Sequence, residues 1–259
     1  MGKHSRATRS HETLALVLRR TPYGDADLIV TLFTRELGQV TALARSARKS
    51  QRRFGGNLEP LHTLEIELDQ AVGADLLRLR EARIVTPRAH LLENLLGMEA
   101  AGKFLSWLRH SAPEHTPEPL LWELSQSCLD DLDLSARDSQ RHLKDSDPAH
   151  SRPKAPSASL TLAAYGLRLL VACGWRLELE HCVQSGLRCP EGKAAMIDPE
   201  RGGLVSRAHG GAPFSVAGAT RQRLIATQSG TANALEEADA DLALQLVERC
   251  LRTHAGLAG

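Results

Sequence analysis

The hydrophobic positions along this chain change their spacing at about Pro87. Before it, apolar residues fall in five short runs, most of them alternating with polar residues, which predicts β-strands. The runs cover residues 14–18, 28–34, 39–44, 63–68 and 77–85. After it, apolar residues recur every three or four positions, as in amphipathic helices. The sequence therefore predicts an α+β protein with a β domain first and a helical domain second.

The first domain is expected to be a small closed barrel. Five short strands over such a short length fit a barrel, and the OB-fold has that strand count. An open five-stranded sheet is the alternative, but no helix comes early enough to cover its second face. We expect the OB-fold nucleic-acid-binding domain to span residues 13–86. Residues 1–12 are polar and basic, which predicts a disordered tail.

The second domain, residues 87–259, is expected to be all-α apart from one insertion. Helical spacing of apolar residues holds over residues 90–108, 118–132, 160–175, 216–227 and 234–254. Trp107 and Trp122 lie on apolar stripes and are expected in the core. Residues 135–159 are rich in Ser, Asp, Arg, Pro and His, which predicts a flexible linker or loop. Residues 180–213 are rich in Gly and Pro and predict an irregular segment.

Charge is distributed unevenly along the chain. The whole protein of 259 residues has a net charge of +1, which indicates no particular partner. Residues 1–60, however, hold eleven Lys and Arg against five Asp and Glu, an excess of six positive charges. The rest of the chain has an excess of five negative charges. This split favours one face for phosphate and a separate, more acidic body.

Cysteine usage and the N-terminal residues bear on location. The five cysteines are odd in number and show no disulfide spacing, and the first residues lack the apolar core of a secretory signal. No apolar run approaches the ~20 residues that cross a bilayer. We therefore expect a cytoplasmic protein that has no membrane partner.

The densest basic segment begins at Arg45 and ends at Asn57. Five cations occupy nine positions in it with no acid among them: Arg45, Arg48, Lys49, Arg52 and Arg53. Such a loop inside a small β domain is typical of a protein that holds nucleic-acid backbone. A solvated basic turn kept for solubility is the alternative, and the uneven charge favours phosphate. Tyr23 and Phe54 flank the segment, where they either stack on bases or fill the ends of the barrel core.

No catalytic constellation stands out. The chain lacks a phosphate-cradling G-x-x-x-x-G-K-[ST], a G-x-G-x-x-G and a G-x-S-x-G nucleophile elbow. Asp130, Asp131 and Asp133 could serve a two-metal nuclease, but their place at the entry to a polar segment favours a solvated helix end. We expect no enzyme. A metal-dependent nucleic-acid hydrolase and an RNA-binding OB-fold module are the alternatives.

Four motifs in the N-terminal third carry a resemblance to a known family. They are Pro22–Asp27, Phe33–Gly38, Ala44–Arg48 and Phe54–Pro60. Over about seventy residues the sequence resembles the bacterial RecO (recombination protein O) family of DNA repair proteins. One departure is Ser46, where glycine is usual. Beyond these residues the likeness is one of layout, with a helical body, a cysteine-containing segment and terminal helices.

The resemblance implies a non-enzymatic recombination mediator with an N-terminal OB-fold. Such a protein binds single- and double-stranded DNA, anneals complementary strands, and works with RecR and single-strand-binding protein to help RecA load. The resemblance therefore implies a protein of the RecF pathway that associates with the nucleoid. The choice of DNA over RNA rests on the resemblance, because phosphate contacts carry no sugar information. The acidic, apolar tail of single-strand-binding protein is expected to dock on the helical domain beside a cation such as Arg109 or Arg168.

A zinc site is also part of the resemblance. In many family members the irregular segment carries two Cys-x-x-Cys pairs, which together suit a tetrahedral zinc ion. The matching positions of this chain hold Cys182, Ser185, Ser206 and His209. Serine is a poor zinc ligand at neutral pH, and Cys189 and His181 could substitute only out of register. We expect a degraded, zinc-finger-like site over residues 180–213, held by packing, and no tightly bound cofactor.

Overall fold

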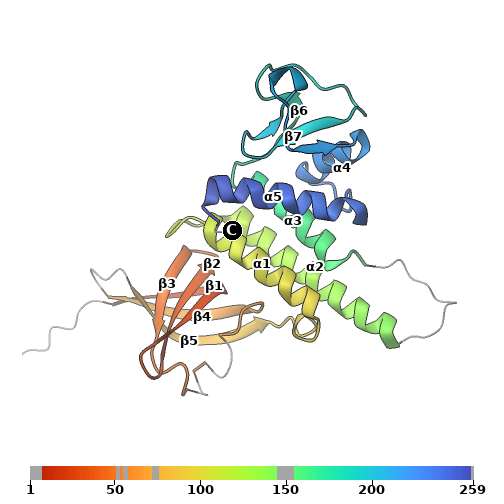
Figure 1. Cartoon of the computed structure of the whole chain (residues 1–259). Coiled ribbons are helices and arrows are strands. Elements are labelled where there is room, and N and C mark those ends of the chain that lie inside the picture. The colour runs from red at the N-terminus through yellow and green to blue at the C-terminus, as the bar shows by residue number, and fades with distance from the viewer. Residues whose placement is uncertain (1–7, 51–52, 55–57, 72–75, 145–154, 258–259) are drawn as a thin grey trace, which may run out of the picture. The chain divides into compact units, whose positions relative to one another are not determined.

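The computed structural model describes residues 8–50, 53–54, 58–71, 76–144 and 155–257 (Figure 1). The chain divides into two compact units. The first unit comprises Met1–Ala89 and Ala112–Leu129, and the second comprises His90–Ser111 and Asp130–Gly259. The first contains the five N-terminal strands and the start of one long helix, while the second contains the remaining helices and a small sheet.

Five strands close into a barrel in the first unit, as the pattern of apolar residues predicts. They are β1 (Thr8–Tyr23), β2 (Asp27–Thr34), β3 (Gly38–Ala44), β4 (Thr63–Ala71) and β5 (Leu77–Thr86). Around the barrel they follow the order β1-β2-β3-β5-β4. β3 and β5 run parallel, and the other neighbouring pairs are antiparallel.

The first strand corrects the prediction of a disordered tail over residues 1–12. β1 begins at Thr8 and pairs with β4 along its first half. Polar residues fit here because one face of the strand is solvated, and the Ser10 hydroxyl donates to Glu67 Oε1 over 3.3 Å. Residues 1–7 lie outside the described part of the chain.

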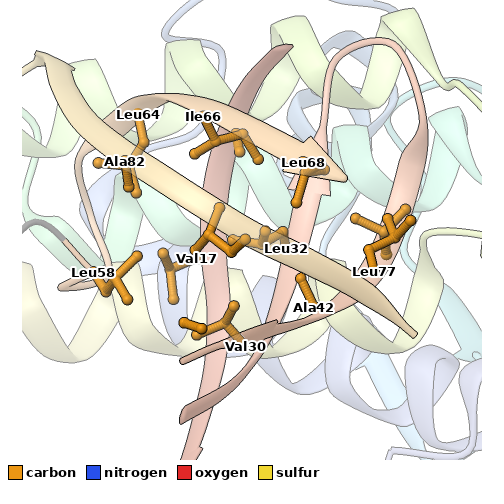
Figure 2. Close-up of a cluster of buried hydrophobic side chains, with 14 of the residues drawn as sticks. Val17, Val30, Leu32, Ala42, Leu58, Leu64, Ile66, Leu68, Leu77 and Ala82 are labelled. Carbon is orange, nitrogen blue, oxygen red and sulfur yellow. The ribbon is translucent and has the colours of Figure 1, made fainter. Parts of the chain in front are cut away.

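The barrel is filled by buried side chains from every strand (Figure 2). On β4 the buried residues Leu64, Ile66 and Leu68 alternate with Glu65 and Glu67, which face outward or are half-buried. This is the two-residue period of a strand that has one face in a core. The alternation that identifies the strands in the sequence is therefore the alternation that fills the barrel.

A buried arginine ties the barrel to the helical part of the first unit. Arg88 is 1% exposed, and its guanidinium donates to the Thr63 hydroxyl over 3.1 Å and to Gln126 Oε1 over 3.0 Å. Gln126 belongs to the first half of α2 (Pro119–Lys144), where Trp122 packs against an aromatic ring of β2. Trp122 is a core residue, as predicted.

The second unit is built from packed helices. They are η1 (Leu91–Glu93), α1 (Leu95–Ser111), the last part of α2, α3 (Ala158–Ala172), α4 (Gly218–Gln228), η4 (Glu237–Asp239) and α5 (Ala240–Ala255). α3 packs against α1 and α5, and Gly166 allows the close approach, because a Cβ there would lie 2.8 Å from the Trp107 ring and 3.0 Å from Val247. Trp107 is buried, which confirms its predicted place in the core. Within the described ranges, no helix combines the length and the apolar character that a membrane span requires.

The long helix α2 corrects the predicted loop over residues 135–159. The helix continues to Lys144, and Ser135 is buried. Few apolar residues lie in this stretch, so its helical spacing does not stand out in the sequence. Residues 145–154 lie outside the described part of the chain, and α3 begins at Ala158.

The segment over residues 180–213 is more regular than predicted. A four-stranded sheet forms around it from β6 (Glu178–Cys182), β7 (Ala195–Asp198), β8 (Gly203–Leu204) and β9 (Phe214–Val216), in the order β6-β8-β7-β9. A short helix, η3 (Arg207–His209), follows β8. Strands of two to five residues are too short to show a period in the sequence. The second unit is therefore not all-α.

Candidate nucleic-acid interface

The segment that follows β3 begins with a basic turn, Arg45–Ser50, which is fixed to the neighbouring β1–β2 turn. The Ser46 N–H donates to Asp27 Oδ1 over 2.7 Å, and the Arg48 N–H donates to the Ala26 carbonyl over 3.0 Å. The basic turn also closes on itself, since two of its N–H groups donate to the Ser46 carbonyl. Its backbone is thus held by contacts within the protein.

Ser46 has a backbone conformation that favours glycine, the residue that the resemblance implies at this position. Its φ is +55°, in the left-handed region that glycine adopts without strain. A residue with a Cβ costs roughly 1–2 kcal/mol there. The hydrogen bond that the Ser46 N–H donates to Asp27 helps to hold the conformation.

The cations of the basic turn are exposed, namely Arg45, Arg48 and Lys49. None of the three forms an ion pair with another described residue. Elsewhere on the barrel, Arg20 pairs with Glu59 and Arg83 pairs with Glu65. A phosphate that approaches the basic turn therefore meets cations for which no carboxylate of the described chain competes.

Arg53 braces the basic turn. Its Nη2 donates to the Arg45 carbonyl over 2.8 Å, and its guanidinium lies 5.1 Å from the centre of the Phe54 ring. Phe54 is 2% exposed and belongs to the barrel core, which corrects its assignment as a DNA-binding residue. Its ring has no face open to a base. Arg52, another predicted contact, lies outside the described residues.

Tyr23 is the aromatic residue of this region that is open to solvent. It ends β1, is 56% exposed, and pairs across the β1–β2 turn with Asp27. Asp27 is also the residue whose carboxylate accepts the Ser46 N–H. One aspartate therefore links Tyr23 to the basic turn, and the ring lies at the same end of the barrel as the cations.

Strand β5 adds two arginines to this region that the sequence reasoning missed. The parallel register pairs Ala44 with Leu79, so Arg80 follows on β5 where Arg45 follows on β3. Arg78 and Arg80 are both exposed, and Arg80 forms an ion pair with an aspartate of β4 over 3.0 Å. The alternation of Leu and Arg over residues 77–80 is a signal for an outward basic face, but it does not reveal which strand lies beside it.

Two of the aspartates considered for a nuclease are engaged in separate hydrogen bonds of the second unit. Asp131 accepts from the Tyr165 hydroxyl over 2.7 Å, and Asp133 accepts from the Leu91 N–H over 3.0 Å. Among the residues that the structure describes, no three His, Cys, Asp or Glu side chains form a group that could hold a metal ion.

The residues considered for zinc lie around the end of β6. Cys182 Sγ accepts the Ser206 N–H over 3.3 Å, and the Ser206 hydroxyl lies 2.8 Å from His209 Nδ1. Donation from the Ser185 hydroxyl is the main cause that lowers the pKa of the Cys182 thiol to about 6. Cys189 lines the same cavity of ≈ 370 Å³ as Cys182.

A larger groove of ≈ 710 Å³ lies within the second unit, between α2, α3 and the segment before α5. Leu134 and Leu160 contribute apolar surface to it, and Arg168 contributes a cation. The Arg168 guanidinium lies 5.3 Å from the centre of the Tyr165 ring and donates to a backbone carbonyl over 3.2 Å. Arg109, the other cation considered for partner docking, is not part of this lining.

The chain thus has two parts. The first is a closed five-stranded barrel with a basic turn, and the second is a helical unit with a small sheet. Residues 9–88 match the family model described as Recombination protein O N terminal. The chain is 34% identical over 217 residues to the DNA repair protein RecO of Anaeromyxobacter sp. (strain K), which covers 83% of this chain and 78% of that protein.

Two further relatives carry the same description. The chain is 33% identical over 181 residues to the DNA repair protein RecO of Geobacter metallireducens, which covers 70% of this chain and 65% of that protein. It is 40% identical over 119 residues to that of Myxococcus xanthus, which covers 46% and 48%. The chain therefore belongs to the RecO family.

Proposed function

We propose that this chain acts in DNA repair and recombination by binding single- and double-stranded DNA and annealing complementary strands. In this role it works with RecR and single-strand-binding protein to help RecA load. The relatives named DNA repair protein RecO support the cellular role. The proposed binding surface rests on three exposed cations, Arg45, Arg48 and Lys49. The backbone that bears them is already held by hydrogen bonds.

The strand order supports assignment of the barrel as an OB-fold. Nucleic acid in OB-folds lies on the face of strands 2 and 3, flanked by the loops that join strands 1 to 2 and 4 to 5. In this chain the β1–β2 turn is the one that holds the basic turn, through Asp27 and Ala26. We therefore place the DNA backbone along the basic turn, with Tyr23 beside it.

Annealing needs contacts of this kind. Two polyanionic strands approach each other only if their phosphates are partly neutralised, and bases must stay free to pair. Cations on a braced turn neutralise phosphates without reading sequence. Tyr23 can add stacking on an unpaired base, which is tolerant of sequence because every base has a π-face.

An annealing assay with complementary oligonucleotides, one of them labelled, tests this proposal. The triple variant Arg45→Ala, Arg48→Ala, Lys49→Ala should anneal more slowly than the native protein at the same concentration. The matched control Arg83→Ala removes an exposed cation of the same barrel that is already paired with Glu65, and it should anneal at the native rate.

Two outcomes would count against the proposal. Native annealing by the triple variant would place the DNA elsewhere on the molecule. Breakdown of the labelled strand during a long incubation without a partner strand would instead support the metal-dependent hydrolase.

We also propose that the groove beside Arg168 receives the acidic, apolar tail of single-strand-binding protein. An apolar wall suits the apolar residues of such a tail, and a cation at its edge suits a carboxylate. The Arg168 guanidinium is oriented by the Tyr165 ring and by a backbone carbonyl, so it needs little reordering on binding.

Binding of a labelled tail peptide, followed by fluorescence anisotropy, tests this docking site. Arg168→Glu should weaken binding strongly because it replaces attraction with repulsion. Arg109→Glu makes the same charge change on α1 away from the groove and should leave the affinity close to native. Equal losses in the two variants would show a general charge effect and refute the groove.

A further inference from the structure

Two turns of the small sheet meet at one sulfur atom. Cys182 ends β6, and its N–H and carbonyl close the following turn by bonding to Leu187 and Gly186 over 2.9 and 2.8 Å. Ser185 lies in that turn, where its hydroxyl accepts the Leu187 N–H over 3.4 Å. From the opposite side, the turn after β8 directs the Ser206 N–H at Cys182 Sγ over 3.3 Å. Cys182 is buried, so the two turns meet inside the small sheet and its connecting turns, which we call the module.

The network continues from Ser206 to the short helix η3. The Ser206 hydroxyl lies 2.8 Å from His209 Nδ1, and the Ser206 carbonyl accepts the His209 N–H over 2.9 Å. Three of the four residues that stand at the zinc-ligand positions of the resemblance, Cys182, Ser206 and His209, are therefore already joined by hydrogen bonds.

This donor set does not fit a structural zinc ion. Such sites take four ligands from thiolates and imidazoles, and here two of the four positions carry hydroxyls, which keep their protons at neutral pH. The Ser206 N–H and hydroxyl already bond to Cys182 and His209. Cys189 lines the neighbouring cavity, but no hydrogen bond joins its side chain to this network in the described residues.

We propose that a hydrogen-bonded network centred on the Cys182 sulfur closes this module in place of a metal ion, and that Ser185 and Ser206 occupy the places of two thiolate ligands. A cysteine sulfur can take this role because it is a hydrogen-bond acceptor, although a weak one, and here it accepts the Ser206 N–H. The cysteine is thus kept as a hydrogen-bond acceptor, and the module folds without a metal.

A buried arginine gives the module a second metal-free closure. Arg221 of α4 is 1% exposed, and its guanidinium donates to the carbonyls of Leu179 over 2.9 Å and Pro190 over 2.5 Å. These carbonyls lie on either side of the turn that Cys182 begins. The arginine therefore ties together the two chain segments on either side of that turn without a metal ion.

The first test is elemental analysis of the full chain, with thermal unfolding in the presence and absence of EDTA. We expect substoichiometric zinc and a midpoint that EDTA does not change. One tightly held zinc per chain, with a midpoint that falls on chelation, would overturn the proposal. In the same assay Cys182→Ala should lower the midpoint, while the matched Cys189→Ala should leave it nearly unchanged. Equal midpoints for the two variants would remove Cys182 from the centre of the network.

A second test rebuilds the metal site. The double variant Ser185→Cys, Ser206→Cys places two thiols beside Cys182 and His209, which completes a Cys₃His set. We expect it to bind one zinc ion per chain when Zn²⁺ is added, with a midpoint that rises with zinc and falls with EDTA. A double variant that takes up no more zinc than the native chain would show that these serines do not occupy ligand positions.

Discussion

Two loops of this chain use polar residues in opposite ways. In the basic turn of the barrel, the backbone N–H groups make the structural hydrogen bonds, and three cations remain exposed. In the small sheet, the residues with candidate chemistry bond to one another, with Cys182 accepting the Ser206 N–H and Ser206 joined to His209. The basic turn leaves its cations exposed to a ligand, whereas the candidate residues of the small sheet are already hydrogen-bonded to one another.

The difference gives a criterion for reading such motifs. A dense set of charged or reactive residues indicates a ligand site when other groups support the loop, as Asp27 and Arg53 do for the basic turn. It indicates a structural site when the same residues are the support. The criterion also distinguishes the two aromatic residues near the basic turn, because Phe54 fills the barrel core and Tyr23 is open to solvent.

The largest expected effect on stability is that of Phe54→Ala, compared with Tyr23→Ala. Phe54→Ala should lower the free energy of unfolding by about 3–5 kcal/mol, because it leaves a cavity in the barrel core. Tyr23→Ala should change it by no more than about 0.5 kcal/mol. Tyr23→Ala should instead weaken single-strand binding by roughly 1–3 kcal/mol if its ring stacks on a base. Urea unfolding and oligonucleotide titration measure the two quantities. A destabilised Tyr23→Ala with native affinity would contradict the assignment.

Arg221 should have the next largest effect. Arg221→Met fills a similar volume but leaves the Leu179 and Pro190 carbonyls without their charged donor, which should cost about 3 kcal/mol of unfolding free energy. Arg207→Ala, an exposed cation of the same module, should be close to neutral. DNA affinity measured well below the melting temperature should be native in both. Reduced affinity in Arg221→Met under those conditions would assign the small sheet a part in DNA binding.

Asp239 tests, through the pH dependence of stability, whether buried charged residues of the second unit act as structural supports. Its carboxylate accepts from the Arg223 guanidinium over 2.9 Å and from the Thr220 hydroxyl over 2.9 Å, and it is almost fully buried. The hydrogen bond from Arg223 is the main cause that holds the pKa of Asp239 below its ordinary value, against the opposing effect of burial. A depressed folded-state pKa stabilises the fold above the unfolded pKa of ~3.9, and this contribution is lost as pH falls through the folded pKa.

Asp239→Asn should therefore lower the unfolding free energy by about 2 kcal/mol at neutral pH and flatten its decline in acid. Urea unfolding over a series from neutral to acidic pH measures both. Asp241→Asn, on the exposed side of the next turn, should leave the acid decline in place. A decline in Asp239→Asn as steep as in the native protein would show that other acids control it.

The smallest effect is expected at Ser46. Ser46→Gly relieves the strain of a positive φ but adds freedom to the unfolded chain, and the two nearly cancel, leaving a gain of at most about 1 kcal/mol. The salt dependence of DNA binding should not change, because the serine hydroxyl has no part in the proposed contacts. A clear loss of affinity in this variant would give Ser46 a direct role.

Much of the barrel can be predicted from the sequence because its core depends on local alternation. The buried Leu64, Ile66 and Leu68 follow the period of a strand, and four of the five predicted strands match the observed ones closely, while β1 is longer than predicted. Pairing between distant strands leaves no such signal. The parallel contact of β3 with β5, which brings Arg80 beside Arg45, appears only in the structure.

The second unit shows where local patterns fail. α2 runs on to Lys144 through a polar stretch, because a helix needs only a narrow buried stripe and Ser135 supplies part of it. β8 has two residues and carries no period of its own. The roles of Phe54 and Arg53 also depend on tertiary contacts, which a charge count along the chain does not contain.

The salt dependence of single-strand DNA binding tests the central claim most directly. Each phosphate contact contributes about 0.7 to the slope of log K against log salt on single strands. The triple variant Arg45→Ala, Arg48→Ala, Lys49→Ala should therefore bind with a slope shallower by about 2 than the native protein. Arg83→Ala should keep the native slope. A triple variant with the native slope would contradict the account, because the exposed cations of the basic turn would then make no phosphate contacts.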